Sequence, residues 1–241
     1  MNTNLFLGVG FAVILSAPRD PSSLPSRTLA FDEVTMHLEV DLPYPVRSLI
    51  DMPTEVVLEV ASPFALAHLR VVSPHGRVVF ELERPDAVST GLAEISLECE
   101  GNSLRDVLRE FPPGEYRVQA TTLKGLPVEG IARLSNRFPG LFAAVAPIDG
   151  EVVPEGDVTI EWTSSRGAAR YVLEVEQEES GFTLEVALIP GETRFTVPAQ
   201  LLRPGVTYEY SLAVQGDTDN ELEVEGRFAT ASGSAGRAFG R

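Results

Sequence analysis

Apolar and polar residues alternate along most of the chain with a period of two, which is typical of β-strands that bury one face against a core. In the first half, this alternation predicts strands at residues 33–42, 55–60, 77–83, 94–100 and 116–122. Proline and glycine lie between them, at 73–76 and at 112–114, where tight turns favour these residues. The first half is therefore predicted to be a β-sandwich.

One segment of the first half has helical spacing instead. Its apolar residues stand at i, i+3, i+4 and i+7, namely Leu104, Val107, Leu108 and Phe111. Ser103 and Asp106 form a plausible N-cap pair at the start of this segment. We predict a short helix over residues 103–111 that crosses between the sheets.

The second half repeats the alternation more regularly. The expected strands lie around 158–163, 171–176, 182–188, 193–197, 206–214 and 222–228. Turns are expected at Pro190-Gly191, Pro204-Gly205 and Gly216-Asp217. Short strands at this spacing, without long helical stretches, predict antiparallel β-sandwiches. The domain boundary should lie at 136–140, where the alternation stops and Pro and Gly cluster.

The N-terminus carries an unbroken apolar run, Leu5–Leu15, which is too short to span a bilayer but suits a signal peptide. We predict the following organisation: signal peptide 1–17, linker 18–29, a first β-sandwich 30–138, a second β-sandwich 139–231 and flexible tail 232–241. Export to the periplasm, the cell surface or the medium follows, with no transmembrane span. No Lys or Arg precedes the run, and Pro18 is unfavourable after a cleavage site, so an apolar strand or helix docked on the body remains the alternative.

Composition and charge narrow the possible partners. The 241 residues are 44% hydrophobic, which is ordinary for a globular protein, and the net charge is −16. Such a polyanion is repelled by nucleic-acid phosphates and anionic lipids, so neither is an expected partner. The charge is uneven: residues 139–231 hold 17 acids and 5 bases, whereas residues 30–138 hold 17 acids and 10 bases.

The residues that could carry chemistry are few. His37 and His68 fall on outward strand positions and His75 in a turn, so no convergent metal or catalytic set is expected. Cys99, the single cysteine, shares an inward face with Ile95 and Leu97, which excludes a disulfide and predicts a small buried side chain. No nucleophile-elbow, phosphate-loop or zinc-protease motif occurs. We therefore predict no catalytic, cofactor-binding or metal residues, and no enzyme.

Two acidic features have competing interpretations. The loop Asp217–Glu221 could offer several oxygens to Ca²⁺, but it lacks the glycine and the distal glutamate of an EF-hand, and it is equally a solvated hairpin tip. Six glutamates of the second half are expected on outward positions: Glu174, Glu176, Glu178, Glu209, Glu223 and Glu225. They could keep the sheet soluble and prevent edge pairing, or they could recognise a basic partner.

Residues 140–231 resemble a fibronectin type III domain. The resemblance rests on Trp162 at the end of the second strand, Tyr171 in the third, and the segment 202–208, which places Tyr208 at the start of the sixth. It implies that Trp162 is buried and that the Tyr208 hydroxyl ties a corner loop to the sheet. The first domain is similar in outline, since residues 111–116 echo that corner, and it is classed as immunoglobulin-like. The pairing resembles bacterial exported proteins that carry a degenerate immunoglobulin-like domain before a type III domain.

These features predict a non-catalytic extracytoplasmic binding or scaffold module that recognises a protein or a cell-envelope glycan. One alternative is an accessory carbohydrate-binding protein, which would need exposed aromatic rings. Trp162, Tyr171, Tyr208 and Tyr210 all occupy inward positions, so Tyr44, between two prolines, is the residue that discriminates this alternative. A second alternative is a Ca²⁺-dependent adhesion module built on the loop at 217–221.

Overall fold

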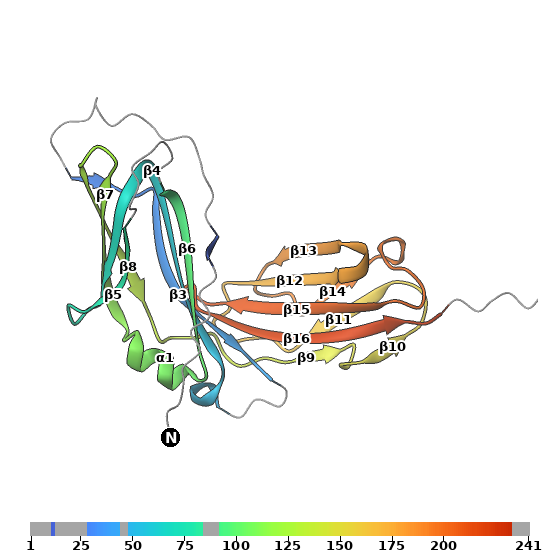
Figure 1. Cartoon of the computed structure of the whole chain (residues 1–241). Coiled ribbons are helices and arrows are strands. Elements are labelled where there is room, and N and C mark those ends of the chain that lie inside the picture. Colours follow the sequence, from blue (N-terminus) through green and yellow to red (C-terminus); the bar gives the residue numbers. More distant parts are fainter. Residues whose placement is uncertain (1–10, 13–27, 44–47, 84–91, 233–241) are drawn as a thin grey trace, which may run out of the picture. The chain divides into compact units, whose positions relative to one another are not determined.

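The chain divides into two compact units, both composed mainly of β-strands (Figure 1). The computed structural model describes residues 11–12, 28–43, 48–83 and 92–232. The first unit consists of Ser48–Arg137, the described residues up to Val40, and Thr218–Asn220. The second consists of Phe138–Asp217, the described residues from Glu221 onward, and residues 41–43. The fold class is all-β, as the alternation predicts.

The first unit contains two sheets that share one strand. Its strands are β1 (Phe11–Ala12), β2 (Leu29–Ala30), β3 (Glu33–Asp41), β4 (Thr54–Val72), β5 (Val78–Glu83), β6 (Leu92–Gly101), β7 (Gly114–Thr122) and β8 (Pro127–Leu134). The first half of β4 pairs with β3 and β6, and its second half pairs with β5 and β7. All these pairs are antiparallel, whereas β2 joins β8 in parallel. A 3₁₀ turn, η2 (Leu49–Asp51), precedes β4.

Strand β4 is 19 residues long, so the strand predicted at 55–60 is only its first part. Pro63 has no backbone N–H and would normally end a strand, which is why the pattern suggests a break there. The Ser62 side chain bridges the interruption, because its Oγ bonds both the N–H and the carbonyl of Phe64. Side chains of both halves, among them Leu58 and Val71, line one small interior void. The bent strand thus contributes to both layers of the sandwich.

The predicted helix is confirmed as α1 (Leu104–Glu110). Ser103 is its N-cap: Oγ accepts a hydrogen bond from the Asp106 N–H at 3.2 Å and donates to the Asp106 carboxylate at 2.9 Å. Leu104 and Val107 are buried, so the apolar stripe read from the sequence faces the core.

The N-terminal region is described only in part. Strand β1 pairs antiparallel with β6, with Phe11 opposite Leu97 and Ala12 opposite Ser96. The rest of the predicted signal peptide at 1–17, most of the linker at 18–29 and the tail after residue 232 lie outside the described residues.

The second unit is a sandwich of a three-stranded and a four-stranded sheet. Its strands are β9 (Ala144–Ala146), β10 (Glu151–Val153), β11 (Val158–Trp162), β12 (Arg170–Gln177), β13 (Phe182–Leu188), β14 (Arg194–Val197), β15 (Thr207–Gln215) and β16 (Glu221–Thr230). The sheet orders are β14-β11-β9 and β13-β12-β15-β16, with antiparallel neighbours. Strand β10 adds in parallel to the end of β16. Two 3₁₀ turns, η3 (Glu178–Ser180) and η4 (Ala199–Leu201), connect strands.

Aromatic rings form the core of this sandwich. Trp162 is only 3% exposed, as expected, and its ring centroid lies 5.6 Å from that of Tyr171. Tyr208 stacks on Phe228 at 5.5 Å. Among the described residues, the Trp162 Nε1–H has no hydrogen-bond partner. Burial of these rings against each other supplies much of the driving force for this unit.

Each unit has a tyrosine hydroxyl that ties down a loop. In the second unit, the Tyr208 hydroxyl accepts a hydrogen bond from the Arg203 N–H at 2.8 Å. In the first, the Tyr116 hydroxyl donates to the Pro112 carbonyl at 2.8 Å. The corner implied for Tyr208 is therefore confirmed, and the first unit has a counterpart with the hydrogen bond reversed.

Candidate binding face on the second unit

The outward face of the sheet β12-β15-β16 is acidic. Alternation places Leu173, Val175 and Leu212 in the core, so their strand neighbours point outward. The outward polar residues are Glu174, Glu176, Glu209, Ser211, Glu223 and Glu225. Five of the six glutamates expected on this face are therefore on these strands, whereas Glu178 begins the turn η3 after β12 has ended. We refer to this set as the acidic face.

The strand register sets carboxylates directly against each other. Glu176 on β12 is opposite Glu209 on β15, and Glu174 is opposite Glu185 on β13. Like charges at directly opposed positions destabilise a sheet, by about 0.2–1 kcal/mol per pair. These two pairs thus carry a local electrostatic cost, which Arg227 on β16, directly opposite Glu209, offsets in part.

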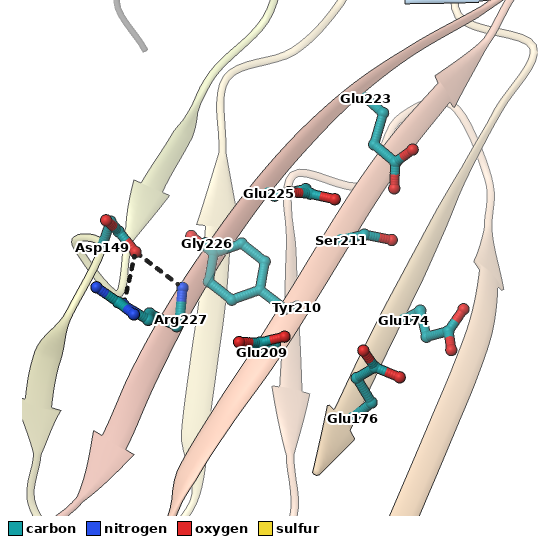
Figure 2. A pocket seen from close by; sticks show the side chains of 10 residues that line it. All are labelled: Asp149, Glu174, Glu176, Glu209, Tyr210, Ser211, Glu223, Glu225, Gly226 and Arg227. Atoms are coloured by element: carbon teal, nitrogen blue, oxygen red, sulfur yellow. Dashed lines mark hydrogen bonds and ion pairs between the residues drawn. The ribbon is translucent and has the colours of Figure 1, made fainter. Parts of the chain in front are cut away.

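The acidic face surrounds a hollow of about 490 Å³ (Figure 2). Arg227 is the one basic residue in its lining. The Asp149 Oδ1 accepts a hydrogen bond from the backbone N–H of Arg227 at 3.2 Å and lies 3.8 Å from its side-chain Nε. Among the described residues, no hydrogen bond or ion pair is made by the carboxylates of Glu174, Glu176, Glu209 and Glu225. The hollow therefore keeps an excess of negative charge.

Tyr210 and Gly226 shape one wall of the hollow. They are opposite each other in the register, and a Cβ atom on Gly226 would lie 2.5 Å from the tyrosine ring, so a side chain there would displace the ring. The Tyr210 hydroxyl donates to the Pro147 carbonyl at 3.2 Å. Burial, and secondly the Asp149 carboxylate, raise the pKa of Tyr210, so the phenol remains a protonated donor at neutral pH.

The carboxylates of the acidic face are spread out rather than converging. In the described part of the second unit, no three His, Cys, Asp or Glu residues bring ligand atoms within 4.8 Å of one another. Such spacing suits several cationic groups distributed along a partner better than a single coordinated ion.

The histidines differ partly from expectation. His75 lies in an exposed turn, and His68 is half-buried with Nε2 3.0 Å from Glu81. The prediction that His37 points outward to solvent is wrong, since this residue is only 9% exposed. It is opposite the buried Val57 in the register, and Nε2 bonds Glu39 at 2.9 Å, so its neighbours cover the ring.

Cys99 is buried, as its position beside Ile95 and Leu97 predicts. Burial raises the pKa of the thiol, and the carboxylates of Glu55 and Glu110 raise it further. The thiol is therefore poorly suited to act as a nucleophile at neutral pH.

The loop at 217–221 does not present its amide to solvent. Asn220 is fully buried, and its Oδ1 accepts a hydrogen bond from the Leu38 N–H at 2.9 Å. Its Nδ2 donates to the carbonyls of Ser135 and Arg137, each at 2.9 Å. All these residues belong to the first unit. One of the oxygens that this loop could offer to Ca²⁺ is therefore already used in the fold.

The aromatic side chains are inward, which bears on the carbohydrate-binding alternative. Trp162, Tyr171, Tyr208 and Tyr210 are all buried, as predicted. In the described ranges from residue 28 onward, no aromatic side chain is largely exposed to solvent. Tyr44 lies outside the described residues.

The sequence identified the glutamates of the acidic face but missed Asp149 and Arg227. The pattern does not single out Asp149, because one sequence cannot show that the turn at 147–150 folds against β16. A carboxylate after an isoleucine in a tight turn is weak evidence by itself. The pairing with Arg227 is visible only in the structure.

Sequence comparison gives no assignment: no family model and no curated protein matches the chain. Structural comparison finds similarity to fibronectin type III proteins. A two-domain segment of chicken tenascin is 20% identical, with a TM-score of 0.32, and the match covers 77% of this chain and 96% of that one. The fibronectin(III)-like modules of Clostridium thermocellum CbhA are 11% identical, with a TM-score of 0.33, covering 97% and 100%. The chicken CNTN1 FN1–FN3 domains are 13% identical, with a TM-score of 0.31, covering 83% and 67%.

The strand order and the tyrosine corner, rather than these superpositions, define the fibronectin type III-like fold of the second unit. Within the part of the chain that the structure describes, no helix is long and apolar enough to span a membrane.

Proposed function

We propose that the protein is a non-catalytic extracytoplasmic binding or scaffold module, and that the acidic face of its second unit recognises a basic protein partner. Fibronectin type III-like sandwiches commonly serve binding or scaffolding. The observation that carries the proposal is the opposition of Glu176 to Glu209 and of Glu174 to Glu185 on one face. A partner that brings Lys or Arg side chains to this face would relieve the repulsion.

The state of the single thiol and the lack of a recognised catalytic motif in the sequence support the non-catalytic part of the proposal. General acid–base or nucleophilic catalysis needs a positioned group with a pKa near neutrality and a supporting partner. The Cys99 thiol has its pKa moved away from neutrality by burial, and His75 lies alone in a turn. A glycan partner is less well supported than a basic protein, because the aromatic rings that stack on sugars are inward.

A pull-down from the native cell envelope, with the full chain as bait, tests the proposed face. The face variant carries Glu176→Gln, Glu209→Gln and Glu225→Gln, and the matched control carries Glu155→Gln, Glu178→Gln and Glu192→Gln, all exposed and outside the hollow. We expect the wild type and the control to retain the same basic protein, and the face variant to lose it. Binding should weaken steeply with salt. Equal retention and equal salt dependence for the two variants would exclude the acidic face.

Export is a separate part of the proposal and rests on the apolar run Leu5–Leu15. N-terminal sequencing of the protein from its native host should give a sequence that starts after Ala17. A protein that starts at Met1 or Asn2 would contradict export with cleavage.

A further inference from the structure

An apolar groove of about 690 Å³ runs beside the acidic face on the second unit. The segment 141–149, which includes β9, and Val224 of β16 supply most of its lining, and Leu42, Thr163, Tyr210 and Glu225 complete it. Strand β10 covers β16 only from Phe228 to Thr230, and the Gly150 N–H bonds the Arg227 carbonyl at 2.8 Å. The groove lies beside the part of β16 that precedes Phe228, which β10 does not cover.

Large aliphatic side chains gather in this groove although they are accessible to water. Leu141 is 47% exposed, Val145 is 50% exposed and Ile148 is 72% exposed. Single exposed aliphatic residues are common on soluble proteins, but a contiguous set in a concavity marks an interaction site. Ile189 is 68% exposed on the same unit but lies outside the groove, and so it is an example of a single exposed aliphatic residue.

The groove and the acidic hollow share a border. Asp149, Tyr210 and Glu225 line both of them, so an apolar surface continues directly into a negatively charged one. A ligand that fills the groove therefore passes the carboxylates of Asp149 and Glu225. Its apolar groups need cationic neighbours in order to match this surface.

We propose that the groove binds an extended segment of the partner protein in which bulky apolar side chains stand next to Lys or Arg. The apolar side chains fill the space between Val145, Ile148 and Val224, and the cationic side chains lie over the acidic face. This inference rests on the proposed function and specifies its partner. An anionic lipid does not match, because the bordering carboxylates would repel its headgroup.

Three short peptides test the proposal against the full-length chain by calorimetric titration. One alternates Lys and Val, the second alternates Lys and Ser, and the third alternates Glu and Val. We expect the Lys–Val peptide to bind at least about tenfold more tightly than the Lys–Ser peptide, because only the former buries aliphatic groups in the groove. The Glu–Val peptide should not bind.

Matched variants locate the binding. Ile148→Ser should remove the advantage of the Lys–Val peptide over the Lys–Ser peptide, whereas Ile189→Ser, at similar exposure, should preserve it. Because both side chains are largely exposed, neither substitution should impair folding, which the unfolding midpoint will verify.

Several results would overturn the inference. Equal affinity for the Lys–Val and Lys–Ser peptides would exclude the groove but leave the acidic face as a binding surface. Binding of neither cationic peptide would also contradict the proposed function. If the Glu–Val peptide bound as tightly as the Lys–Val peptide, the stated chemistry would be refuted. If Ile148→Ser and Ile189→Ser reduced the affinity for the Lys–Val peptide equally, the stated location would be refuted. A concentration-dependent dimer that Ile148→Ser abolishes would place a second copy of this chain in the groove instead.

Discussion

One strand pair in each unit shows two opposite ways of placing an outward carboxylate. In the first unit, Glu115 on β7 is opposite Arg133 on β8, and the two side chains form an ion pair at 2.9 Å. In the second, Glu176 on β12 is opposite Glu209 on β15, and neither carboxylate has an ion-pair partner among the described residues. The same strand geometry therefore gives an ion pair in one case and a like-charge pair in the other. The contrast holds for these pairs, since Glu209 is also opposite Arg227 on β16 and the first unit has a like-charge pair of its own, Glu39 opposite Glu55. The like-charge pair of the second unit lies within the face that we propose for binding, and the predictions below test it.

The pattern extends beyond these two pairs. In the first unit, Arg77 bonds Glu110 at 2.6 Å, and Thr35 donates to Glu59 at 3.2 Å. The sequence already shows the imbalance, since residues 139–231 have half as many bases as residues 30–138 for the same number of acids. What the structure adds is that five glutamates of the second unit share one face.

The comparison requires the second unit to be a sandwich with its own core, and Trp162→Ala is the strongest test of this. We expect a loss of about 3–5 kcal/mol, because the substitution removes a buried ring and leaves a cavity. Trp162→Phe should cost less, since the Nε1–H that it removes has no partner. Denaturant unfolding followed by far-UV circular dichroism will measure both. Negligible shifts for both variants would refute the assigned core.

The two tyrosine corners allow the units to be compared through one hydrogen bond in each, with the hydroxyl as acceptor in the second unit and as donor in the first. Tyr208→Phe should destabilise the second unit by about 1–3 kcal/mol, because it leaves the Arg203 N–H without its acceptor. Tyr116→Phe should cost about 0.5–1.5 kcal/mol, because it deprives only the Pro112 carbonyl of a donor, and unsatisfied carbonyls are tolerated better than unsatisfied N–H groups.

Unfolding midpoints of the two variants, each against wild type, will test this order. The fluorescence of Trp162, the only tryptophan in the chain, reports on the second unit. A larger loss for Tyr116→Phe than for Tyr208→Phe would show that donor and acceptor roles do not decide the cost.

Neutralising one carboxylate in each unit tests the charge comparison directly. Glu176→Gln should stabilise the second unit by about 0.2–1 kcal/mol, because it removes repulsion with Glu209. Glu115→Gln should destabilise the first unit by a similar or smaller amount, about 0–1 kcal/mol, through loss of an exposed ion pair. Opposite signs in urea unfolding at low salt are expected, and both effects should shrink as salt is added. A destabilised Glu176→Gln variant would show that the acidic face is compensated after all.

The sequence predicted the strands whose alternation is regular. The expected strand at 182–188 coincides with β13, and the helix with its Ser103 cap is correct. The second half of β4 was missed because Pro63 looks like a strand end, and β9 and β10 have only three residues each, too few to show a period.

The candidate site was predictable only in part, because its chemistry depends on register. Alternation shows that Glu176 and Glu209 point outward, but only pairing shows that they oppose each other. Asn220 is the clearest failure: a polar amide in an acidic loop resembles a solvated tip, yet it is fully buried by hydrogen bonds to backbone groups distant in sequence. Local patterns carry no information about such long-range partners.

The smallest expected effect concerns calcium and distinguishes a diffuse acidic surface from an ion site. Adding Ca²⁺ in constant ionic strength, with Mg²⁺ as the matched control, should leave the thermal unfolding midpoint unchanged. The Asn220 oxygen is occupied by the Leu38 N–H, and the carboxylates of the acidic face do not converge on one point. A bound ion would stabilise the folded state in proportion to the logarithm of its concentration. A Ca²⁺-specific rise in the midpoint that Asp219→Asn abolishes would therefore restore the calcium-dependent adhesion alternative and weaken the contrast between the two units.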